Sequence, residues 1–326
     1  MNRLRDFLNP NHTPEQIESK YNLKESDNYK LDKARQLLIK VDIESFIYPI
    51  LYRPFDKRYI FFSEIFCERL RKEVMNSLKL DNLALILSRQ QKEIGFKHCL
   101  VTDTIGDGNT MSVNSREYNY YFPLYIYPNT ENQQTNLFIE KTSNLSPKFL
   151  EPIKNKLGKT PTPEKIFYYA YAIFHSPTYR SRYAEFLKID FPRLPLTTNQ
   201  TLFNSLAEKG EELVNLHLMK STTLKNLITT FANEGNNQVS EVTYNSELQR
   251  VYINKQSYFT DITQHIWEFK IGGYQVLDKW LKDRKNANRV LSDDEIIHYQ
   301  KIVVALTETL RLMQEIDNLI PDFPIK

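Results

Sequence analysis

The sequence predicts an α+β fold, in which a mixed β region with loops packs against a helical hairpin and further C-terminal helices. Two observations support this prediction. Residues 42–128 contain short segments rich in β-branched and aromatic residues, the composition of strands. Beyond residue 141, apolar residues recur at three- and four-residue spacings, the period of a helix with one buried side. With 326 residues, the chain is long enough to bury a substantial core.

The composition argues against several classes of protein. A net charge of +3 is too small for a global positive field, so any basic surface has to be local. Cys67 and Cys99 stand alone, without the Cys or His partners of a zinc site or a disulfide scaffold, so we expect no metal and a cytoplasmic location. No apolar run approaches the length of a membrane span, and the N-terminus has no signal-peptide pattern, so we expect no membrane contact.

We divide the chain into an N-terminal connector arm, residues 1–41, and a domain that covers residues 42–326. The arm is polar and holds one short predicted helix, Leu31–Ile39. Within the domain, we expect residues 42–140 to form a mainly β lobe. We expect residues 141–326 to form a mainly helical lobe with an inserted β-hairpin.

The β lobe is predicted to consist of short strands, one helix and a polar loop. The helix covers Arg69–Leu78, and a Gly-Asp-Gly-Asn loop lies within Ile105–Asn114. The predicted strands are Ile47–Tyr52, Tyr59–Phe62, Leu83–Ser88, His98–Thr102 and Tyr120–Tyr127.

A hydrophobic hairpin early in the helical lobe is predicted to be the centre of the core. Thr162 is a good N-cap and Pro163 suits the first helical position. The helix that follows is apolar on almost every side from Ile166 to Phe174, which is typical of a buried helix. Ser176-Pro177 ends it and begins a second helix. The buried face of that second helix is predicted to hold Tyr179, Tyr183, Phe186 and Leu187, and two prolines then keep Phe191–Leu196 extended.

The rest of the helical lobe is predicted to combine helices with one hairpin. A long helix covers Thr201–Met219, a hairpin covers Val239–Tyr258, and a further helix covers Tyr274–Asp283. Ser292 and Glu295 form a capping box at the start of the last helix. That helix carries a narrow apolar seam of the kind that packs on other helices: Ile296, Tyr299, Val303, Leu306, Leu310 and Met313.

A search for catalytic motifs finds little. The nearest match to the Asn/Asp-Pro-Pro-Tyr/Phe loop of adenine methyltransferases is Asn119-Tyr120-Tyr121-Phe122, which lacks both prolines. Gly106-Asp107-Gly108 is a lone G-x-G outside the strand-turn-helix context of a methyl-donor pocket, and no phosphate-binding loop of the ATPase type is present. We therefore expect no catalytic residue and no cofactor in this chain.

One alternative is a small metal-dependent nuclease. Asp261, Glu268 and Lys270 superficially match the carboxylate-and-lysine set that surrounds Mg²⁺ in many nucleases. However, Trp267 and Phe269 flank the charged residues, which favours an ordinary alternating strand with a solvated face.

The β lobe contains residues that favour nucleic-acid binding. Residues 52–98 hold ten Lys and Arg against six Asp and Glu, a local net charge of +4. Arg89-Gln90-Gln91-Lys92 follows a predicted strand, and Arg and Gln can each make two hydrogen bonds to a base edge. The same pattern also fits a solvated strand end. Arg53 and Asp56 can pair within a turn instead, and Gly272-Gly273 can be either a plain turn or the phosphate-binding start of a helix.

Four blocks in order resemble the C-terminal specificity (target-recognition) domain of type ISP restriction–modification enzymes. The blocks are DIESFIYPILYRPFDKRYIFF from Asp42, YYFPLYIYP from Tyr120, TPEKIFYYAYAIFHSPTYRSRYAEFLKIDFPRLPL from Thr162 and WEFKIGGYQVLDKWLKDR from Trp267. The resemblance covers about residues 41–317.

This resemblance implies a function. The chain would recognise a sequence in double-stranded DNA, beside an adenine-N6 methyltransferase that flips its target adenine and an ATP-dependent translocase and nuclease. S-adenosylmethionine, ATP and Mg would be bound only by those partner domains. An unpartnered remnant of a split restriction enzyme is the remaining alternative. The predicted DNA-binding residues are Arg53, Arg58, Arg89, Gln90, Gln91, Lys92, Thr102, Asn109, Arg180, Arg182, Lys270 and Gln275, of which Arg180 and Arg182 suit phosphates better than bases.

Overall fold

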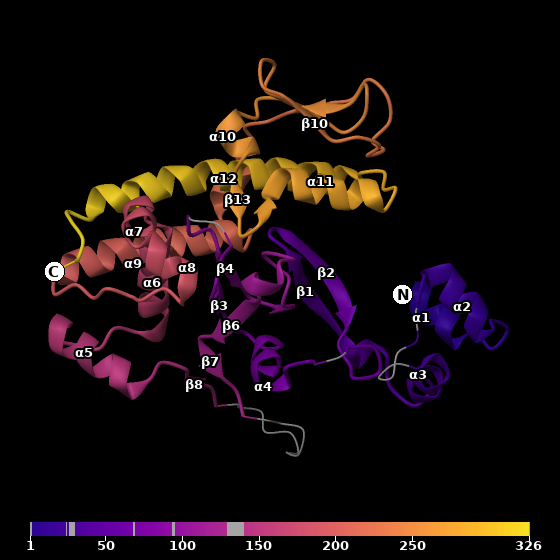
Figure 1. Cartoon of the computed structure of the whole chain (residues 1–326), viewed down its shortest axis with the longest axis horizontal. Helices are drawn as coiled ribbons and strands as arrows, with labels where there is room; N and C mark the ends of the chain where they lie inside the picture. The colour runs from indigo at the N-terminus through magenta and orange to yellow at the C-terminus, as the bar shows by residue number, and fades with distance from the viewer. Residues whose placement is uncertain are drawn as a thin grey trace.

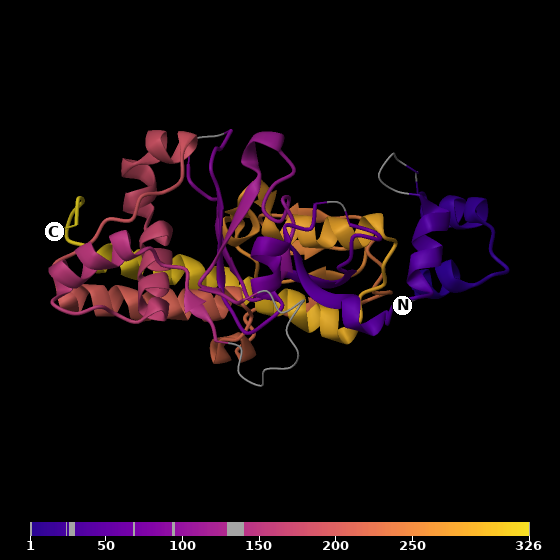
Figure 2. The ribbon, with the colours of Figure 1, turned by 90° about the horizontal axis from the view of Figure 1, so that it is seen from below.

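The computed structural model describes residues 2–23, 25, 30–67, 69–92, 95–128 and 140–325. Its last helix, α12 (Asp293–Leu319), runs across the molecule, with the segment 243–267 on one side of it and the other sheets and helices mainly on the opposite side (Figure 1). The predicted α+β class is therefore confirmed. The N-terminal arm and the C-terminus lie at opposite ends in both views (Figure 1, Figure 2).

The N-terminal arm contains more helix than the sequence predicted. α1 (Asn2–Leu8) and α2 (Pro14–Tyr21) precede α3 (Leu31–Leu38), which confirms the predicted helix. A capping box formed by Thr13 and Gln16 begins α2. These helices bury a small core made of Phe7, Ile17, Leu31 and Leu38, and Phe61, Ile65 and Phe66 of the neighbouring β region pack against it.

Two three-stranded sheets and the β7–β8 pair form the β region. In the first, β1 (Ile47–Arg53) lies between the antiparallel strand β2 (Asp56–Phe61) and the short parallel strand β5 (Ile105–Gly106). In the second, β3 (Ala84–Ser88) lies between the antiparallel strands β4 (Cys99–Thr102) and β6 (Asn119–Pro123). The predicted strands are confirmed, with Tyr120–Tyr127 divided into β6 and β7. The remaining elements of this region are α4 (Lys72–Met75), β7 (Tyr125–Ile126) and β8 (Thr142–Ser143), together with 3-10 turns at Glu44–Phe46, Asn76–Leu78 and Ser115–Glu117.

The predicted hydrophobic hairpin is present and lies at the centre of the helical part. α6 (Pro163–His175) is capped by Thr162, and Ser176 caps α7 (Pro177–Arg182). α6 packs on α9 (Gln200–His217) so closely that a Cβ on Gly210 would lie 1.8 Å from the Tyr168 carbonyl oxygen. α5 (Pro147–Leu157) precedes this hairpin, and a 3-10 turn at Thr222–Lys225 follows α9.

One core assignment in this hairpin is wrong. The second helix is interrupted at Tyr183 and resumes as α8 (Ala184–Ile189). Tyr179 and Leu187 are buried as predicted, but 71% of Phe186 is exposed. The backbone of Tyr183 is not helical, with φ of −104° and ψ of 17°, so a single helical period no longer describes both helices.

The C-terminal part contains a larger sheet than predicted. The predicted hairpin is confirmed as β10 (Thr243–Asn245) and β11 (Arg250–Tyr252), and β12 (Tyr258–Phe259) and β9 (Phe231–Ala232) extend it to a four-stranded sheet. α10 (Gln264–Trp267), β13 (Lys270–Ile271), β14 (Tyr274–Gln275) and α11 (Val276–Asn286) then lead to α12. Ser292 and Glu295 make the predicted capping box on α12.

A single hydrophobic core joins the β region to the helices. It includes Ile86 of β3, Tyr169 of α6 and Leu306 of α12, each with no exposed surface. Along the α12 seam, Ile296, Tyr299, Val303 and Leu306 are buried, whereas Leu310 and Met313 are half-buried. Within the part of the chain that the structure describes, no helix has the length and apolar character needed to cross a membrane.

Candidate nucleic-acid interface

The segment after β3 presents three of the predicted DNA-binding side chains to solvent. Gln90 and Lys92 are exposed, and 60% of the Arg89 side chain is exposed, with its Nε 3.1 Å from Asp190 Oδ1. Gln91 points inward and is only 6% exposed. The prediction that Gln91 contacts a base edge does not fit this arrangement, because its amide group is occupied inside the protein.

Gln91 instead anchors the segment to α8. Its Nε2 donates to the Leu187 carbonyl at 2.8 Å, and its backbone N–H donates to the Lys188 carbonyl at 3.0 Å. Because the Gln91 amide nitrogen is the donor in that bond, its Oε1 faces His98 Nδ1, 3.0 Å away, as an acceptor. The backbone that carries Arg89, Gln90 and Lys92 is therefore held firmly.

A buried glutamate holds the other side of this segment. Glu117 Oε1 accepts from the Lys92 backbone N–H at 2.8 Å, and Glu117 Oε2 accepts from the Ser112 hydroxyl at 2.6 Å. Burial by itself would raise the pKa of Glu117, but these hydrogen bonds outweigh it and lower the pKa below its usual value. For His98, burial acts in the opposite direction and lowers the pKa of the imidazole, whose Nε2 lies 3.4 Å from this carboxylate.

Asn119 links the strand end to the Gly-Asp-Gly-Asn loop. Its Nδ2 donates to Ser88 Oγ at 3.1 Å, and its backbone N–H donates to the Gly108 carbonyl at 3.0 Å. Asn109 on this loop is exposed, as the prediction requires. Thr102 is fully buried and donates to the Thr104 carbonyl at 2.9 Å, so its assignment as a DNA contact does not fit the structure.

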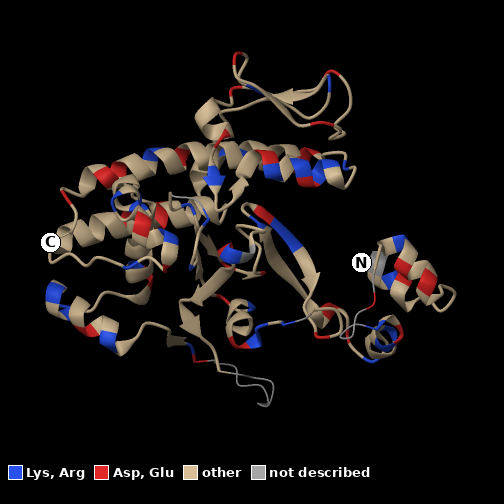
Figure 3. Cartoon of the chain, in the orientation of Figure 1, with Lys and Arg blue, Asp and Glu red and all other residues tan. Residues whose placement is uncertain are grey.

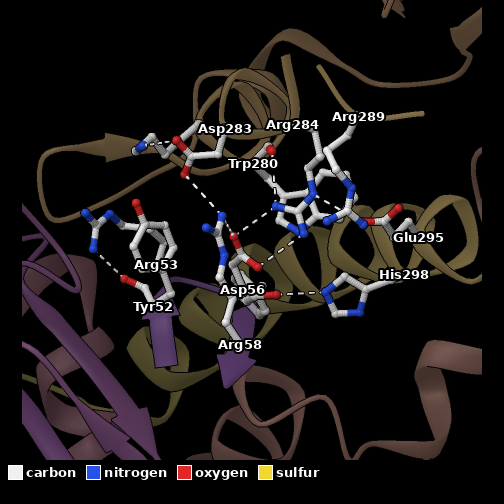
Figure 4. Close-up of polar contacts among 12 residues, drawn as sticks. Tyr52, Arg53, Asp56, Arg58, Trp280, Asp283, Arg284, Arg289, Glu295 and His298 are labelled. Carbon is white, nitrogen blue, oxygen red and sulfur yellow. Dashed lines mark hydrogen bonds and ion pairs between the residues drawn. The ribbon is translucent and has the colours of Figure 1, made fainter. Parts of the chain in front are cut away.

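The turn between β1 and β2 is bound by an ion pair to α11 (Figure 4). The alternative pair of Arg53 with Asp56 does not form, because Asp56 is bound by Arg284 of α11 at 2.9 Å and by Arg58 at 2.8 Å (Figure 4). Arg53 is 9% exposed and its guanidinium lies over the Tyr52 ring, 4.0 Å from the centroid. Arg53 and Arg58 are thus engaged within the protein, although 42% of the Arg58 side chain remains exposed.

The two arginines of the helical hairpin have different surroundings. Arg180 is half-buried and turns inward, where its Nε donates to the Phe174 carbonyl at 2.6 Å. The predicted phosphate contact of Arg180 is not tested by this arrangement and stays a prediction. Arg182 is exposed and lies 3.7 Å from the Asp322 carboxylate.

Gly272 and Gly273 form a tight turn between β13 and β14, and α11 begins only at Val276. The Gly272 N–H donates to the Lys97 carbonyl at 2.8 Å, and the Gly273 N–H donates to the Met111 carbonyl at 2.9 Å. These amides are therefore unavailable to a phosphate. Lys270 is exposed, whereas Gln275 is half-buried and donates to the Trp267 carbonyl at 2.6 Å.

Glu268, which the nuclease alternative uses, directly follows a short helix. Trp267 closes the short helix α10, so the predicted alternating strand around Glu268 is wrong. Glu268 accepts a hydrogen bond from Gln264 at 2.8 Å. Over the residues that the structure describes, no three Asp, Glu, His or Cys side chains are grouped to hold a metal ion.

The structure also reveals a surface that the sequence analysis did not use. Tyr118, Tyr120 and Phe122 are each 40–45% exposed, and the ring of Phe191 packs on Tyr120 and Phe122 at 5.2 and 5.4 Å. Beside this aromatic surface, Arg116 is exposed. The alternating pattern of β6 could have indicated this surface. Asn119, Tyr121 and Pro123 are buried, so Tyr120 and Phe122 lie on the outer face of the strand.

Charges of both signs are mixed along most helices, including α11 and α12 (Figure 3). A recognition surface on this scaffold is consequently local, and the strand end with exposed Arg89, Gln90 and Lys92 is a surface of that kind. These features define a mixed α+β domain with a rigidly mounted polar surface, the type of module that recognises another macromolecule.

The chain belongs to the family of Type ISP C-terminal specificity domains, whose family model matches residues 1–315. That match includes the N-terminal arm. No curated protein matches the sequence.

Solved structures share the fold at low sequence identity. The ATP-dependent Type ISP restriction–modification enzyme LlaBIII bound to DNA is similar over 100% of this chain, with a TM-score of 0.69 and 20% identity. The DrdV–DNA complex is similar over 96%, with a TM-score of 0.69 and 19% identity. A nuclease-deletion mutant of the Type ISP enzyme LlaGI with a DNA substrate mimic is similar over 100%, with a TM-score of 0.64 and 18% identity. This chain spans 22%, 32% and 30% of those three chains.

Proposed function

We propose that this chain recognises a sequence in double-stranded DNA as the specificity domain of a restriction–modification enzyme. Its family and the DNA complexes of its structural relatives support this proposal. The observation that carries it is the rigid mounting of exposed Arg89, Gln90 and Lys92 at the end of β3, between Gln91 on one side and Glu117 on the other. Side chains that discriminate bases need such a fixed backbone.

The exposed side chains have complementary chemistry. Arg makes paired hydrogen bonds to guanine O6 and N7, and Gln does so to adenine N6 and N7. Lys92 suits a phosphate, which positions the protein without carrying sequence information. Arg116 and Asn109 lie on the segments that Glu117 and Asn119 hold beside the strand end, so they extend the same surface.

The partners are also part of the proposal. The chain spans a third or less of its solved relatives, so the remaining activities would belong to other domains. These would be an adenine-N6 methyltransferase with S-adenosylmethionine, and a translocase and nuclease with ATP and Mg. This chain would itself be non-catalytic, because it has no Asn/Asp-Pro-Pro loop and no methyl-donor motif.

A methylation assay tests the non-catalytic role. The purified chain, incubated with duplex DNA and a labelled methyl donor, should incorporate only background label. Clear adenine methylation by the chain alone would contradict the proposal.

Duplex binding at several salt concentrations tests the interface. Each Lys or Arg contact with a phosphate adds about 0.9 to the slope of log K against log salt. Lys92→Ala should therefore reduce the magnitude of this slope by about 0.9, the value for one lost contact. Arg311→Ala is a matched control, because Arg311 lies on α12 and pairs there with Glu308 at 2.7 Å. Equal slopes for the wild type and Lys92→Ala would remove Lys92 from the interface, and binding that is insensitive to salt would contradict DNA recognition.

A further inference from the structure

A cavity of about 770 Å³ lies between the β1–β2 sheet, α4 and β6. This volume is within the range of about 300–1,000 Å³ that small-molecule sites have. Its floor is apolar and includes Ile50, Phe62 and Met75. The loop at Gly106–Gly108 and the segment Tyr118–Tyr121 complete its walls.

Two tyrosines form one wall with their rings partly open to solvent. Tyr118 is 45% exposed and Tyr120 is 43% exposed, and their ring centroids are 5.6 Å apart in an edge-to-face arrangement. Phe191 packs edge-to-face on Tyr120, with ring centroids 5.2 Å apart. A Cβ on Gly108 would lie 2.1 Å from the Tyr118 ring, so glycine is what lets the loop support that ring. Fixed, partly exposed rings of this kind are stacking surfaces for bases.

Two arginines line the same cavity and have no partner among the described residues. Arg69 and Arg71 are exposed, and the side chain of neither makes an ion pair or hydrogen bond with any residue that the structure describes. Both have left-handed backbone, with φ of 55° and 51°, which is uncommon for residues other than glycine. Arg58 and Arg284, in contrast, are paired with Asp56. A guanidinium that faces solvent in this way is well suited to bind a phosphate through two hydrogen bonds.

A carboxylate adds a polar group to this cavity. Asp107 lines it, and 42% of its side chain is exposed. Its Oδ1 accepts the Asn109 backbone N–H at 2.7 Å, while Oδ2 has no hydrogen bond to the described residues. A carboxylate oxygen accepts a hydrogen bond from the amino group of cytosine.

We infer that this cavity binds a single unstacked nucleotide, with its base against Tyr118 and Tyr120, its phosphate at Arg69 and Arg71, and an amino group of the base facing Asp107. Two sources supply this chemistry: an extrahelical nucleotide of bound DNA, and a free mononucleotide. The first source rests on the DNA recognition proposed above. In that case the cavity would contact an unpaired base, a contact that a fully paired duplex cannot make.

The test compares two duplexes that differ by one bulged nucleotide, using the full 326-residue chain. The bulged base is 2-aminopurine, which keeps an exocyclic amino group and is quenched when it stacks on an aromatic ring. The chain should bind the bulged duplex about fivefold to a hundredfold more tightly than the paired one, the range for one base stacked on an aromatic side chain. Binding should also quench the 2-aminopurine fluorescence.

The double variant Tyr118→Ala/Tyr120→Ala should lose both the preference and the quenching, while its affinity for the paired duplex is unchanged. Arg69→Ala/Arg71→Ala should likewise lose the preference. Tyr59→Ala is the matched control, since Tyr59 is 80% exposed on β2 and does not line the cavity. Circular dichroism checks that each variant folds; if the double tyrosine variant does not, the single variants Tyr118→Ala and Tyr120→Ala replace it.

The outcomes separate this inference from the proposed function. Equal affinity for the two duplexes, or a preference that survives in the tyrosine variants, would overturn the extrahelical source and leave DNA recognition intact, and the dCMP titration described next would decide the site. If neither duplex binds, the proposed function fails, and a titration with dCMP then decides the site. Saturable dCMP binding that the tyrosine variants abolish would assign the cavity to a free mononucleotide, and its absence would overturn the site.

Discussion

At the scale of single residues, Asp56 shows that the sequence can indicate an important turn without indicating what the turn does. Its neighbours in the sequence predicted a basic DNA-binding turn, yet only 3% of its side chain is exposed and Arg284, from α11, binds it. Burial by itself raises the pKa of Asp56, but the hydrogen bonds from Arg284 and Arg58 outweigh this effect and lower the pKa. The turn thus joins the first sheet to the C-terminal helices.

Asp56→Ala should destabilise the protein by about 3 kcal/mol, the lower end of the range for a broken buried pair, because the Arg284 guanidinium then keeps only its longer ion pair with Glu295, at 3.7 Å. Urea denaturation measures this change. Glu64→Ala is the control, because 74% of the Glu64 side chain is exposed in its ion pair with Lys72 and such pairs contribute about 0–1 kcal/mol. A loss for Asp56→Ala no larger than that of Glu64→Ala would show that the Asp56–Arg284 ion pair does not stabilise the contact between the β1–β2 turn and α11.

The same carboxylate predicts a pH dependence. The folded-state pKa of Asp56 is below its usual value of 3.8, so its contribution to stability is present above about pH 4 and is lost as the pH falls through the folded pKa. The difference in unfolding free energy between wild type and Asp56→Ala should therefore be full at pH 7 and shrink below pH 4. A difference that grows on acidification would contradict this assignment.

Among the predicted contacts, residue type was predictable and orientation was not. Arg89, Gln90, Lys92 and Asn109 are exposed, whereas Gln91 and Thr102 are buried. Nothing in the sequence distinguishes Gln90 from Gln91, because the partner of Gln91 is a carbonyl 96 residues away, at Leu187. Whether the exposed residues contact DNA stays a prediction.

At the scale of elements, local signals were reliable where caps and periodicity agreed. The caps at Thr162, Ser176 and Ser292 all form as predicted. The interruption at Tyr183 carries no proline or glycine, and it is this interruption that exposes Phe186. Small strands such as β9 and β12 also escaped prediction, since two residues are too few to show an alternating pattern.

Tyr179→Ala and Phe186→Ala should differ clearly in their effect on the free energy of unfolding. Tyr179 is 2% exposed and its hydroxyl donates to the Arg193 carbonyl at 2.7 Å, so its removal should cost about 3–5 kcal/mol. Phe186 is 71% exposed, and its removal should change stability by less than about 0.5 kcal/mol. Denaturation midpoints measure both, and similar losses would mean that α8 is packed in solution.

Two glycines with positive φ form a second matched pair. Gly158 has φ of 72° and a Cβ there would meet no atom within 4 Å, so Gly158→Ala should cost only the backbone strain, about 1–2 kcal/mol. Gly272 has φ of 60°, and a Cβ there would lie 2.3 Å from the Met111 carbonyl oxygen. Gly272→Ala should therefore be clearly the more destabilising in thermal unfolding. Equal effects would show that the β13–β14 turn is not tightly packed on the Met111 loop.

At the scale of the whole molecule, the class and the order of the elements were predictable, and their arrangement was not. Strands and helices were placed because composition and period are local properties. The contact between the β1–β2 turn and α11 joins residues 228 positions apart, and no local pattern encodes it. The boundary between a β lobe and a helical lobe at residues 140–141 stays a sequence prediction, although the core continues across it.

The central claim is that the exposed side chains at the end of β3 select a DNA sequence. The most direct measurement is the motif that the chain enriches from a pool of random duplexes at low salt. The wild type should enrich one motif, and Arg89→Ala and Gln90→Ala should each relax one position by about fivefold to a hundredfold, equivalent to about 1–3 kcal/mol for a paired contact. Enrichment of the same unrelaxed motif after Arg89, Gln90 and Lys92 are all replaced by Ala would contradict the claim.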